Sequence, residues 1–387
     1  MSFNFLSGIN ALGLSALGFL FVLTLVVFFH ELGHFLVARW CGVRVMVFSI
    51  GFGPELFGFD DRHGTRWKIS AIPLGGYVKF FGDENAASVP DQQALAAMSA
   101  SERAHSFIDQ PVAKRAAIVV AGPLANFLLA IAIFAGLAIV FGKPITSPRV
   151  DKVHPDSAAA AAGFQPGDVV LTINGRPIES FNDMQEVVST SAGQTLTFEV
   201  DRGGSRVVLK AVPALKEVKD RFGNVSRQGQ LGIERSTAPE EKHFQPVGPL
   251  QAVGIGVQRT WFVVERTFSF IGGIFSGREA ADQLGGPIRI AQVSGQVAAE
   301  GLLPLFSLTA VLSISIGLLN LFPVPLLDGG HLMFYAIEAV RGKPLSERVQ
   351  ELGFRIGFAV VVMLMIFVTY NDILHVAARW TAWWTAS

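Results

Sequence analysis

Two histidines and a glutamate interrupt an apolar stretch near the N-terminus, VVFFHELGHFLVARWCG. His30, Glu31 and His34 fit the pattern H-E-x-x-H, in which residues four apart lie on the same face of a helix. Both imidazoles can therefore bind one metal ion, and Glu31 can take a proton from a water molecule beside it. Ionisable side chains are costly inside a membrane span, so these three indicate function rather than packing.

A third ligand is expected at the end of a later apolar stretch. A catalytic zinc ion takes three protein ligands and leaves one position for water. Besides Glu31, the acidic residues near the apolar stretches are Asp328, Glu338 and Asp372. Asp328 ends one stretch in NLFPVPLLDGGH, and the distribution of basic residues along the chain puts it at the membrane depth of the two histidines. We therefore expect one Zn²⁺ per chain, held by His30, His34 and Asp328.

The residues around Asp328 predict a broken helix. Pro323 and Pro325 exclude a regular helix before it, and Gly329 and Gly330 allow the chain to turn after it. Broken helices present functional groups inside membrane proteins. The alternative is an ordinary helix end.

The composition is that of a membrane protein. Half of the 387 residues are hydrophobic, only 16% are charged, and the mean hydropathy is +0.44. In soluble proteins about a quarter of the residues are charged. The formal net charge of +0 gives no reason to expect a nucleic-acid partner. The single cysteine, Cys41, excludes an internal disulfide and a multi-cysteine metal site.

Four apolar stretches are long enough to cross the bilayer. The first begins at Ala11, and we expect it to be a retained span rather than a cleaved signal, because no Lys or Arg precedes Arg39. The stretch 249–275 is apolar but interrupted by Arg259, Glu265 and Arg266, which favours a helix on the membrane surface. The expected segments are 1–40, 113–141, 302–330 and 353–376 as spans, 41–112 as a loop, 146–236 as an inserted domain and 247–301 as an interfacial helical region.

Basic residues predict the orientation. They gather in the loop between the first two spans and again between the last two, so both loops face the cytoplasm. Both termini and the region 143–301 then lie outside, and the histidines and Asp328 lie near the cytoplasmic side.

The outer region predicts a compact α+β domain. Strands are expected at 148–153, 169–173, 195–201 and 206–212, and helices at 157–162 and 181–191, with tight turns at Asn174-Gly175 and Gly203-Gly204. The segment SAAAAAGFQPGDVVLTINGRPI resembles the core of a PDZ domain. PDZ domains bind extended peptides by strand addition, so a peptide or protein ligand is expected; a purely structural β-domain is the alternative.

The first basic loop predicts a β-hairpin over 66–81. Residues 66–71 alternate polar and apolar, Gly75-Gly76 turns the chain, and 77–81 returns it. The hairpin is apolar for a loop beside a membrane, so we expect it to dip into the bilayer, where protein or a water-filled cavity must cover its backbone. Its open edge is expected to pair with an unwound substrate. The pairing residues are Gly75, Gly76, Tyr77, Val78 and Lys79.

Three motifs together resemble the site-2 protease family of intramembrane zinc metalloproteases. They are HELGH in the first span, GPLAN in the second and NLFPVPLLDGG in the third. The segments GFGP, IPLGGYVKFFGDEN, GGPIRIAQVSG and KPLSERVQELGFRIG resemble its bacterial branch that acts in the sigma-E envelope stress response. The resemblance covers nearly the whole chain. One departure is that well-known members carry two tandem PDZ domains, whereas this chain has room for one.

The resemblance implies roles for individual residues. His30, His34 and Asp328 would be the zinc ligands, and Glu31 the general base and acid. Asn320 would hold the substrate backbone or stabilise the oxyanion, and Asn126 would belong to the substrate-binding group beside it. Residues implied to shape the site are Gly33, Gly122, Pro123, Pro323, Pro325, Gly329 and Gly330.

We therefore expect a polytopic α-helical membrane protein with about four transmembrane helices, an inserted α+β PDZ domain and a membrane-associated β-hairpin. The resemblance implies a protease in the bacterial inner membrane, with a periplasmic PDZ domain. Its expected substrates are trimmed single-span proteins such as anti-sigma factors and signal-peptide remnants. One alternative is a catalytically inactive PDZ-bearing scaffold or adaptor, which an incomplete H-E-x-x-H or a missing Asp would favour. A transporter is a further alternative, but it predicts an inverted repeat that the sequence lacks.

Overall fold

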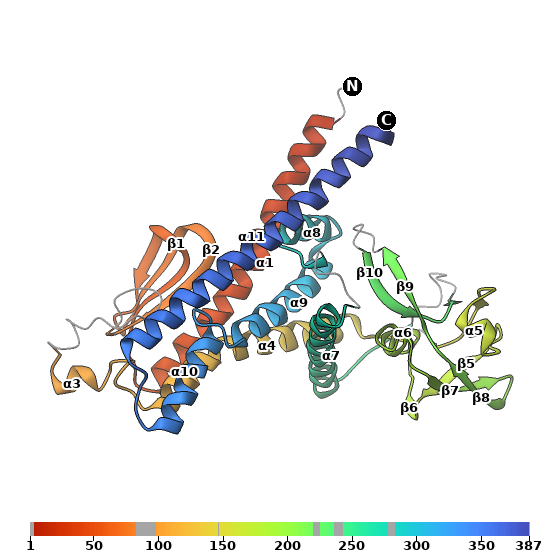
Figure 1. Cartoon of the computed structure of the whole chain (residues 1–387), viewed down its shortest axis with the longest axis horizontal. Helices are drawn as coiled ribbons and strands as arrows, with labels where there is room; N and C mark the ends of the chain where they lie inside the picture. The colour runs from red at the N-terminus through yellow and green to blue at the C-terminus, as the bar shows by residue number, and fades with distance from the viewer. Residues whose placement is uncertain are drawn as a thin grey trace. The chain divides into compact units, whose positions relative to one another are not determined.

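The computed structural model describes residues 4–82, 98–145, 147–219, 225–235, 243–277 and 283–386, and the chain forms two compact units. Unit 1 comprises residues 1–134, 256–264 and 284–387, and unit 2 comprises 135–255 and 265–283. Figure 1 shows that unit 1 consists mainly of long helices beside a sheet, and that short strands and short helices lie together in unit 2. A polytopic helical protein with an inserted α+β domain is thus confirmed.

Four helices of the described chain are long and apolar enough to cross a membrane. The number of spans agrees with the sequence prediction, and α11 is the least covered, because only 6% of its apolar window is buried. The ends of α1 and α11 that carry the termini lie at the same end of unit 1 (Figure 1). These helices are α1 (Asn4–Trp40), α4 (Val112–Phe141), α9 (Leu302–Leu321) and α11 (Glu347–Ala386).

Shorter helices connect and brace the spans. Helix α8 packs along the first part of α1, where Ser15 lies against Gly295. The buried carboxylate of Asp372 in α11 accepts hydrogen bonds from the backbone N–H groups of Gly286, Ile288 and Arg289, so it caps α8 from a neighbouring helix. Helices α3 (Ala100–Arg103), α8 (Pro287–Ala299) and α10 (Asp328–Arg341) are shorter than any of the four spans, whereas α7 (Pro249–Phe275), with 27 residues, is longer than α9.

The β-region after α1 differs from the predicted hairpin. Strands β1 (Val45–Asp60) and β2 (Arg66–Phe80) are both long and bent. Residues 45–50 pair with 76–80 and also with 66–69, while 55–60 pair with 66–70. The expected pairing of 66–71 with 77–81 is therefore wrong, because the apolar segment 45–50, with Val45 and Phe48 buried, lies between them. Among the described strands, 76–78 pairs with another strand on one side only, so this edge is open.

The sheet is fixed to the end of α1 by aromatic stacking and a half-buried ion pair. The Trp67 indole stacks on Phe48 with ring centroids 4.3 Å apart and meets Phe35 of α1 edge-on at 4.9 Å. Asp61 pairs with Arg39 of α1 and accepts the Trp67 indole N–H. Burial alone would raise the pKa of Asp61, but hydrogen bonds from the Thr65 N–H, Trp67, the His63 N–H and Arg39 lower it to about 2. These contacts set the position of the open edge relative to α1.

Unit 2 has the element order that the sequence predicts. The turn at Asn174-Gly175 has positive φ at both residues, and β7 pairs with β8 across Gly203-Gly204. The main sheet has the order β6-β5-β7-β8 and encloses a core that includes Phe164 and Phe198. The elements are β3 (Lys143–Ile145), β4 (Lys152–Val153), α5 (Ala158–Ala161), β5 (Val169–Ile173), β6 (Arg176–Pro177), α6 (Phe181–Thr190), β7 (Leu196–Arg202), β8 (Ser205–Ala211), β9 (Ala214–Lys219), β10 (Val225–Gln230), β11 (Ile233–Glu234) and β12 (His243–Gln245).

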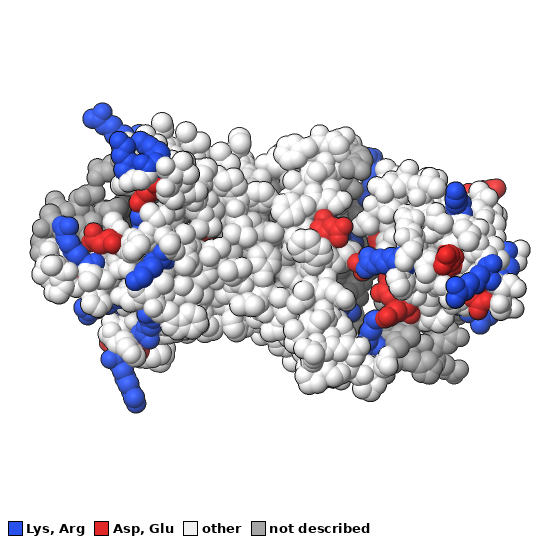
Figure 2. All heavy atoms as spheres, turned by 90° about the horizontal axis from the view of Figure 1, so that it is seen from below, with Lys and Arg blue, Asp and Glu red and all other residues white. Residues whose placement is uncertain are grey.

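The distribution of charge fits a membrane-embedded unit 1. On the face that Figure 2 shows, charged side chains of unit 1 gather at the end that carries the sheet, and its helical remainder is almost uncharged. In the same view, unit 2 carries both positively and negatively charged side chains. An uncharged band along long apolar helices is the surface that hydrocarbon requires.

Candidate metal centre

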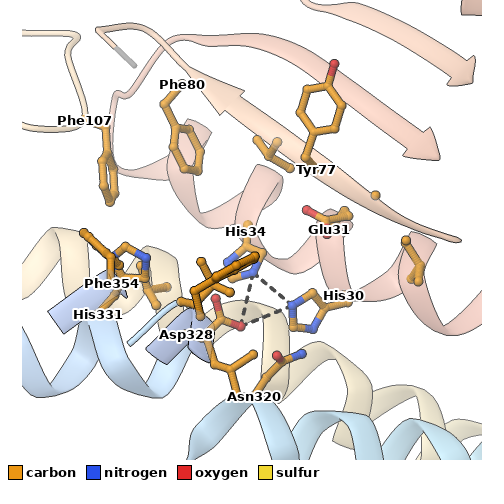
Figure 3. Close-up of a pocket in the computed structure, with 18 of the residues that line it drawn as sticks. His30, Glu31, His34, Tyr77, Phe80, Phe107, Asn320, Asp328, His331 and Phe354 are labelled. Atoms are coloured by element: carbon orange, nitrogen blue, oxygen red, sulfur yellow. Dashed lines mark hydrogen bonds and ion pairs between the residues drawn. The ribbon is translucent and has the colours of Figure 1, made fainter. Parts of the chain in front are cut away.

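The H-E-x-x-H histidines lie on one face of α1, facing α4 and α10. His30 and His34 are each only 9% exposed, and their Nε2 atoms lie 3.3 Å apart. Figure 3 shows both rings pointing toward Asp328, while Glu31 lies beside them on the side of β2. The helix continues to Trp40, so the pair is held by regular helical structure on both sides.

Asp328 reaches the histidines from the break between α9 and α10. Its Oδ2 lies 3.2 Å from the His30 Nε2 and 3.6 Å from the His34 Nε2. Helix α9 ends at Leu321, the chain crosses Pro323 and Pro325 without regular structure, and Asp328 is the first residue of α10. Leu326 has φ of +100°, a strained value for a side chain of this size, as is common at functional sites. Both the break and the place of Asp328 agree with the prediction.

The three ligand atoms have the spacing that a tetrahedral zinc ion requires. Ligands about 2.0 Å from zinc lie about 3.3 Å from one another at tetrahedral angles. The observed separations are 3.2, 3.3 and 3.6 Å. Asp328 Oδ2 is buried without a hydrogen-bond donor, so a cation is the partner that this atom lacks. In the described chain this is the one group of three His, Cys, Asp or Glu residues that could hold a metal ion.

Helix α4 forms the wall behind the histidines. The His34 Nδ1 lies 2.9 Å from the backbone carbonyl oxygen of Ile118, so Nδ1 carries the proton and Nε2 is free to bind metal. Gly122 is required here, because a Cβ would stand 2.5 Å from the His34 Cε1 and closer still to Nε2. Gly33 of α1 has the same function from the other side, since a Cβ would stand 2.8 Å from the carbonyl carbon of Ala121. The GPLAN motif therefore brings α4 close enough to fix the imidazoles.

A cavity of about 910 Å³ opens on the ligand atoms. Its roof is the open edge of β2, and its floor includes the end of α9 (Figure 3). The volume lies in the range of sites that enclose sizeable ligands. Glu31 faces this space from α1, so it can act on a water molecule in the cavity.

The remaining predicted residues fall into two groups. Those that line the cavity are Gly75, Gly76, Tyr77, Val78 and Asn320. Those that do not line it are Lys79, Asn126, Gly33, Gly122, Pro123, Pro323, Pro325, Gly329 and Gly330. Asn126 is fully buried behind His30. Gly329 and Gly330, in the first turn of α10, lie close to backbone carbonyl groups of residues 321–324. Pro123 has no backbone N–H, so the Val119 carbonyl of α4 lacks its helical hydrogen bond.

Several cavity residues are absent from the sequence prediction. Phe354 and Arg355 reach the cavity from the start of α11, and Phe107 reaches it from the segment before α4. His331 packs against Phe354, with the two rings tilted by 49° and their centroids 5.4 Å apart. The abrupt change from polar to apolar residues at the start of α11 is a signal that could have placed Phe354 near the site. The Ile118 carbonyl is a backbone group and leaves no signal in the sequence.

Unit 2 contains a second, smaller cavity of about 310 Å³. It lies between α6 and the segment 228–234, and Met184, Val188 and Leu231 form its apolar part. His154 and Glu234 pair at its rim.

Comparisons with known proteins agree with this geometry. The sequence profile of Peptidase family M50 matches residues 18–364. A protein of Rhizobium meliloti described as a zinc metalloprotease is 53% identical over 92% of this chain and 95% of its own. The metalloprotease MmpA of Caulobacter vibrioides is 42% identical over 92% and 94%. The regulator of sigma-E protease RseP of Escherichia coli is 31% identical over 92% and 97%.

Among solved structures, the PDZ domain of an SdrC-like protein from Listeria monocytogenes is similar to part of this chain. The two are 18% identical with a TM-score of 0.18, and the match covers 24% of this chain and 87% of the Listeria chain.

Proposed function

Because this chain belongs to peptidase family M50 and is a zinc-dependent protease, we propose that it cleaves peptide bonds in or near the transmembrane segments of single-span membrane proteins. The observation that carries the proposal is the position of the three ligand atoms. They lie among the apolar helices, in a cavity roofed by an open strand edge. Such a site suits a substrate that arrives through the bilayer and is held as an extended chain.

His30, His34 and Asp328 would hold one zinc ion per chain. When bound, zinc polarises the scissile carbonyl and lowers the pKa of a water molecule from about 15.7 towards 7. Glu31 takes the proton as this water attacks and passes it to the leaving amine. The carboxylate is suited to this because it follows His30 directly and faces the cavity. The Ile118 carbonyl fixes the tautomer of His34, and helix α1 holds Glu31 at a constant position relative to the two histidines.

Asn320 stabilises the oxyanion or holds the substrate backbone. Its amide lies at the end of α9, below the ligand atoms and lining the cavity. An amide N–H fixed beside the scissile bond stabilises negative charge as it develops on the carbonyl oxygen.

The open edge of β2 supplies hydrogen bonds that a cleavable helix has to give up. A transmembrane substrate hides its carbonyls in its own helix, so it must unwind before water can attack. Residues 75–78 line the cavity along the edge that has no strand partner among the described residues. Pairing with this edge holds the unwound segment across the zinc site.

We place the protein in the bacterial inner membrane with both termini and the PDZ-like unit 2 in the periplasm. Basic residues in the two loops support this, as does the arrangement of α1 and α11, whose free ends lie together. The zinc site then lies near the cytoplasmic side, because the sheet and α10 follow the ends of spans that lead there.

Unit 2 selects substrates by size, so that only trimmed proteins reach the site. Anti-sigma factors and signal-peptide remnants are substrates of this kind, and regulated proteolysis in envelope stress signalling is the pathway that the likeness to RseP favours. The groove between α6 and 228–234 binds a peptide or protein ligand. Deleting 146–236 should let an untrimmed substrate be cleaved; continued refusal of that substrate would contradict this role.

The test of the activity is Glu31→Gln in full-length protein reconstituted with a single-span substrate. We expect zinc content to stay at one ion per chain while cleavage is lost. Glu300→Gln, which changes a carboxylate outside the cavity, is the matched control and should cleave normally. Cleavage retained by Glu31→Gln would refute the general-base role, and cleavage by a protein stripped of zinc would refute the metal mechanism.

A further inference from the structure

Asn126 contacts the side of His30 that faces away from the zinc site. Its amide lies 3.2 Å from the His30 Nδ1, on helix α4. The side chain is fully buried, and its Oδ1 has no hydrogen-bond partner. A buried amide oxygen without a donor costs about 1–3 kcal/mol, so its retention beside a metal ligand requires an explanation.

The position of Asn126 does not suit contact with a substrate. It does not line the cavity, and its amide contacts the Nδ1 side of the His30 ring, whereas Asp328 lies at the Nε2 side of the same ring. Asn320, by contrast, lines the cavity below the same ring. Of the two asparagines that the motifs single out, only Asn320 can reach a scissile carbonyl.

A histidine that binds metal through Nε2 keeps its proton on Nδ1 and needs an acceptor there. For His34 that acceptor is the Ile118 carbonyl. For His30 the neighbouring polar group is the Asn126 amide, whose oxygen and nitrogen exchange places by a half-turn of the side chain. With Oδ1 turned toward His30, the orphaned oxygen gains a donor and the histidine gains its acceptor.

We propose that Asn126 is a positioning residue for zinc: its Oδ1 accepts the Nδ1 proton of His30 and so fixes the tautomer and the ring angle with which His30 binds the ion. Ile118, Gly122 and Asn126 are spaced four residues apart and therefore share one face of α4. This face serves both histidines, with an acceptor at each end and space for a ring between them. The inference rests on His30 being a zinc ligand.

The experiment measures the zinc dissociation constant of full-length protein in detergent by competition with a chromophoric chelator. Asn126→Leu keeps the size of the side chain and removes the acceptor, and we expect zinc binding to weaken about 10–100-fold. Asn126→Asp keeps an acceptor oxygen at the same position and should restore tight binding. Ser313→Ala is the matched control: its hydroxyl donates to the backbone oxygen of Asn126, so it perturbs the same contact between α4 and α9 without touching the amide.

The outcomes separate the inference from its premise. His30→Ala should abolish tight zinc binding; if it does not, His30 is not a ligand and the proposed function fails at that residue. If His30→Ala loses zinc but Asn126→Leu binds it as tightly as the wild type, the positioning role is wrong. A loss of turnover in Asn126→Leu at unchanged zinc affinity would likewise overturn it and assign the residue to the substrate. If Ser313→Ala weakens zinc binding as much as Asn126→Leu does, the effect comes from the packing of α4 against α9 and the positioning role is wrong.

Discussion

The closeness of α4 to the proposed zinc ligands predicts that a single methyl group at Gly122 will weaken zinc binding strongly. In Gly122→Ala the new Cβ would stand 2.5 Å from the His34 Cε1 and 2.9 Å from its Cδ2. Carbon atoms in van der Waals contact lie about 3.5 Å apart, so the ring must move by about 1.0 Å. Metal–ligand distances vary by only about 0.2 Å. His34 therefore cannot remain a ligand unless α4 moves.

Movement of α4 is opposed at both sides of Gly122. Gly33 holds α1 against the Ala121 carbonyl, and Gly317 of α9 packs on the other side, where a Cβ would stand 3.2 Å from the Asn126 Cβ. We therefore expect Gly122→Ala to weaken zinc binding by more than about 100-fold, beyond the effect of losing a residue that only orients a ligand. Cleavage of a single-span substrate should fall with it.

The assay is chelator competition on purified full-length protein, followed by cleavage at saturating zinc. Gly136→Ala is the control, because it lies on the same helix and a Cβ there meets nothing within 4 Å. It should bind zinc normally, and the helix should gain up to about 1 kcal/mol, the difference between alanine and glycine in helix propensity. A Gly122→Ala protein with wild-type zinc affinity would refute the reasoning, because it would show that α4 and α1 can separate at no cost to the site.

Three further predictions concern the elements that hold the site and unit 2. Proline at Tyr77, Val78 or Lys79 should lower cleavage at unchanged zinc content, because proline cannot donate a backbone hydrogen bond; unchanged cleavage would contradict strand pairing. Asp61→Asn should destabilise the protein in thermal unfolding at neutral pH. The difference from wild type should shrink as pH falls from about 4 to 2, since the folded pKa of about 2 lies below the unfolded value of about 3.9. A pH-independent difference would show that the hydrogen bonds to the ionised Asp61 carboxylate do not stabilise the fold. Arg202→Ala should destabilise unit 2 by about 3 kcal/mol in denaturant unfolding, because it removes the ion-pair partner of the buried Asp168 carboxylate. The control Arg206→Ala, on the neighbouring strand, should have little effect.

The β-region shows the limit of pattern reading most clearly. The alternation in 66–71 and the turn at Gly75-Gly76 correctly indicate strands and an open edge, but they predict the wrong neighbours. Local pattern favours pairing between segments that are adjacent in sequence. The more apolar segment 45–50 instead takes the central position, because it buries Val45 and Phe48 against α1 and the aromatic side chains around Trp67. Which strand lies between two others is decided by burial across the whole unit.

The spans and the candidate metal-binding residues, by contrast, follow from the sequence alone. Apolar length determines four spans, the spacing of His30 and His34 places both rings on one helix face, and the prolines before Asp328 break the helix that presents it. These are short-range effects of side-chain type and backbone geometry. Tertiary structure decided the rest: the separations of 3.2 to 3.6 Å among the ligand atoms, the Ile118 carbonyl that fixes His34, and the place of Asn126 behind His30 rather than in the cavity. They could not be read from the chain because each joins residues far apart in sequence, and only the packing of α1 against α4 and α10 brings them together.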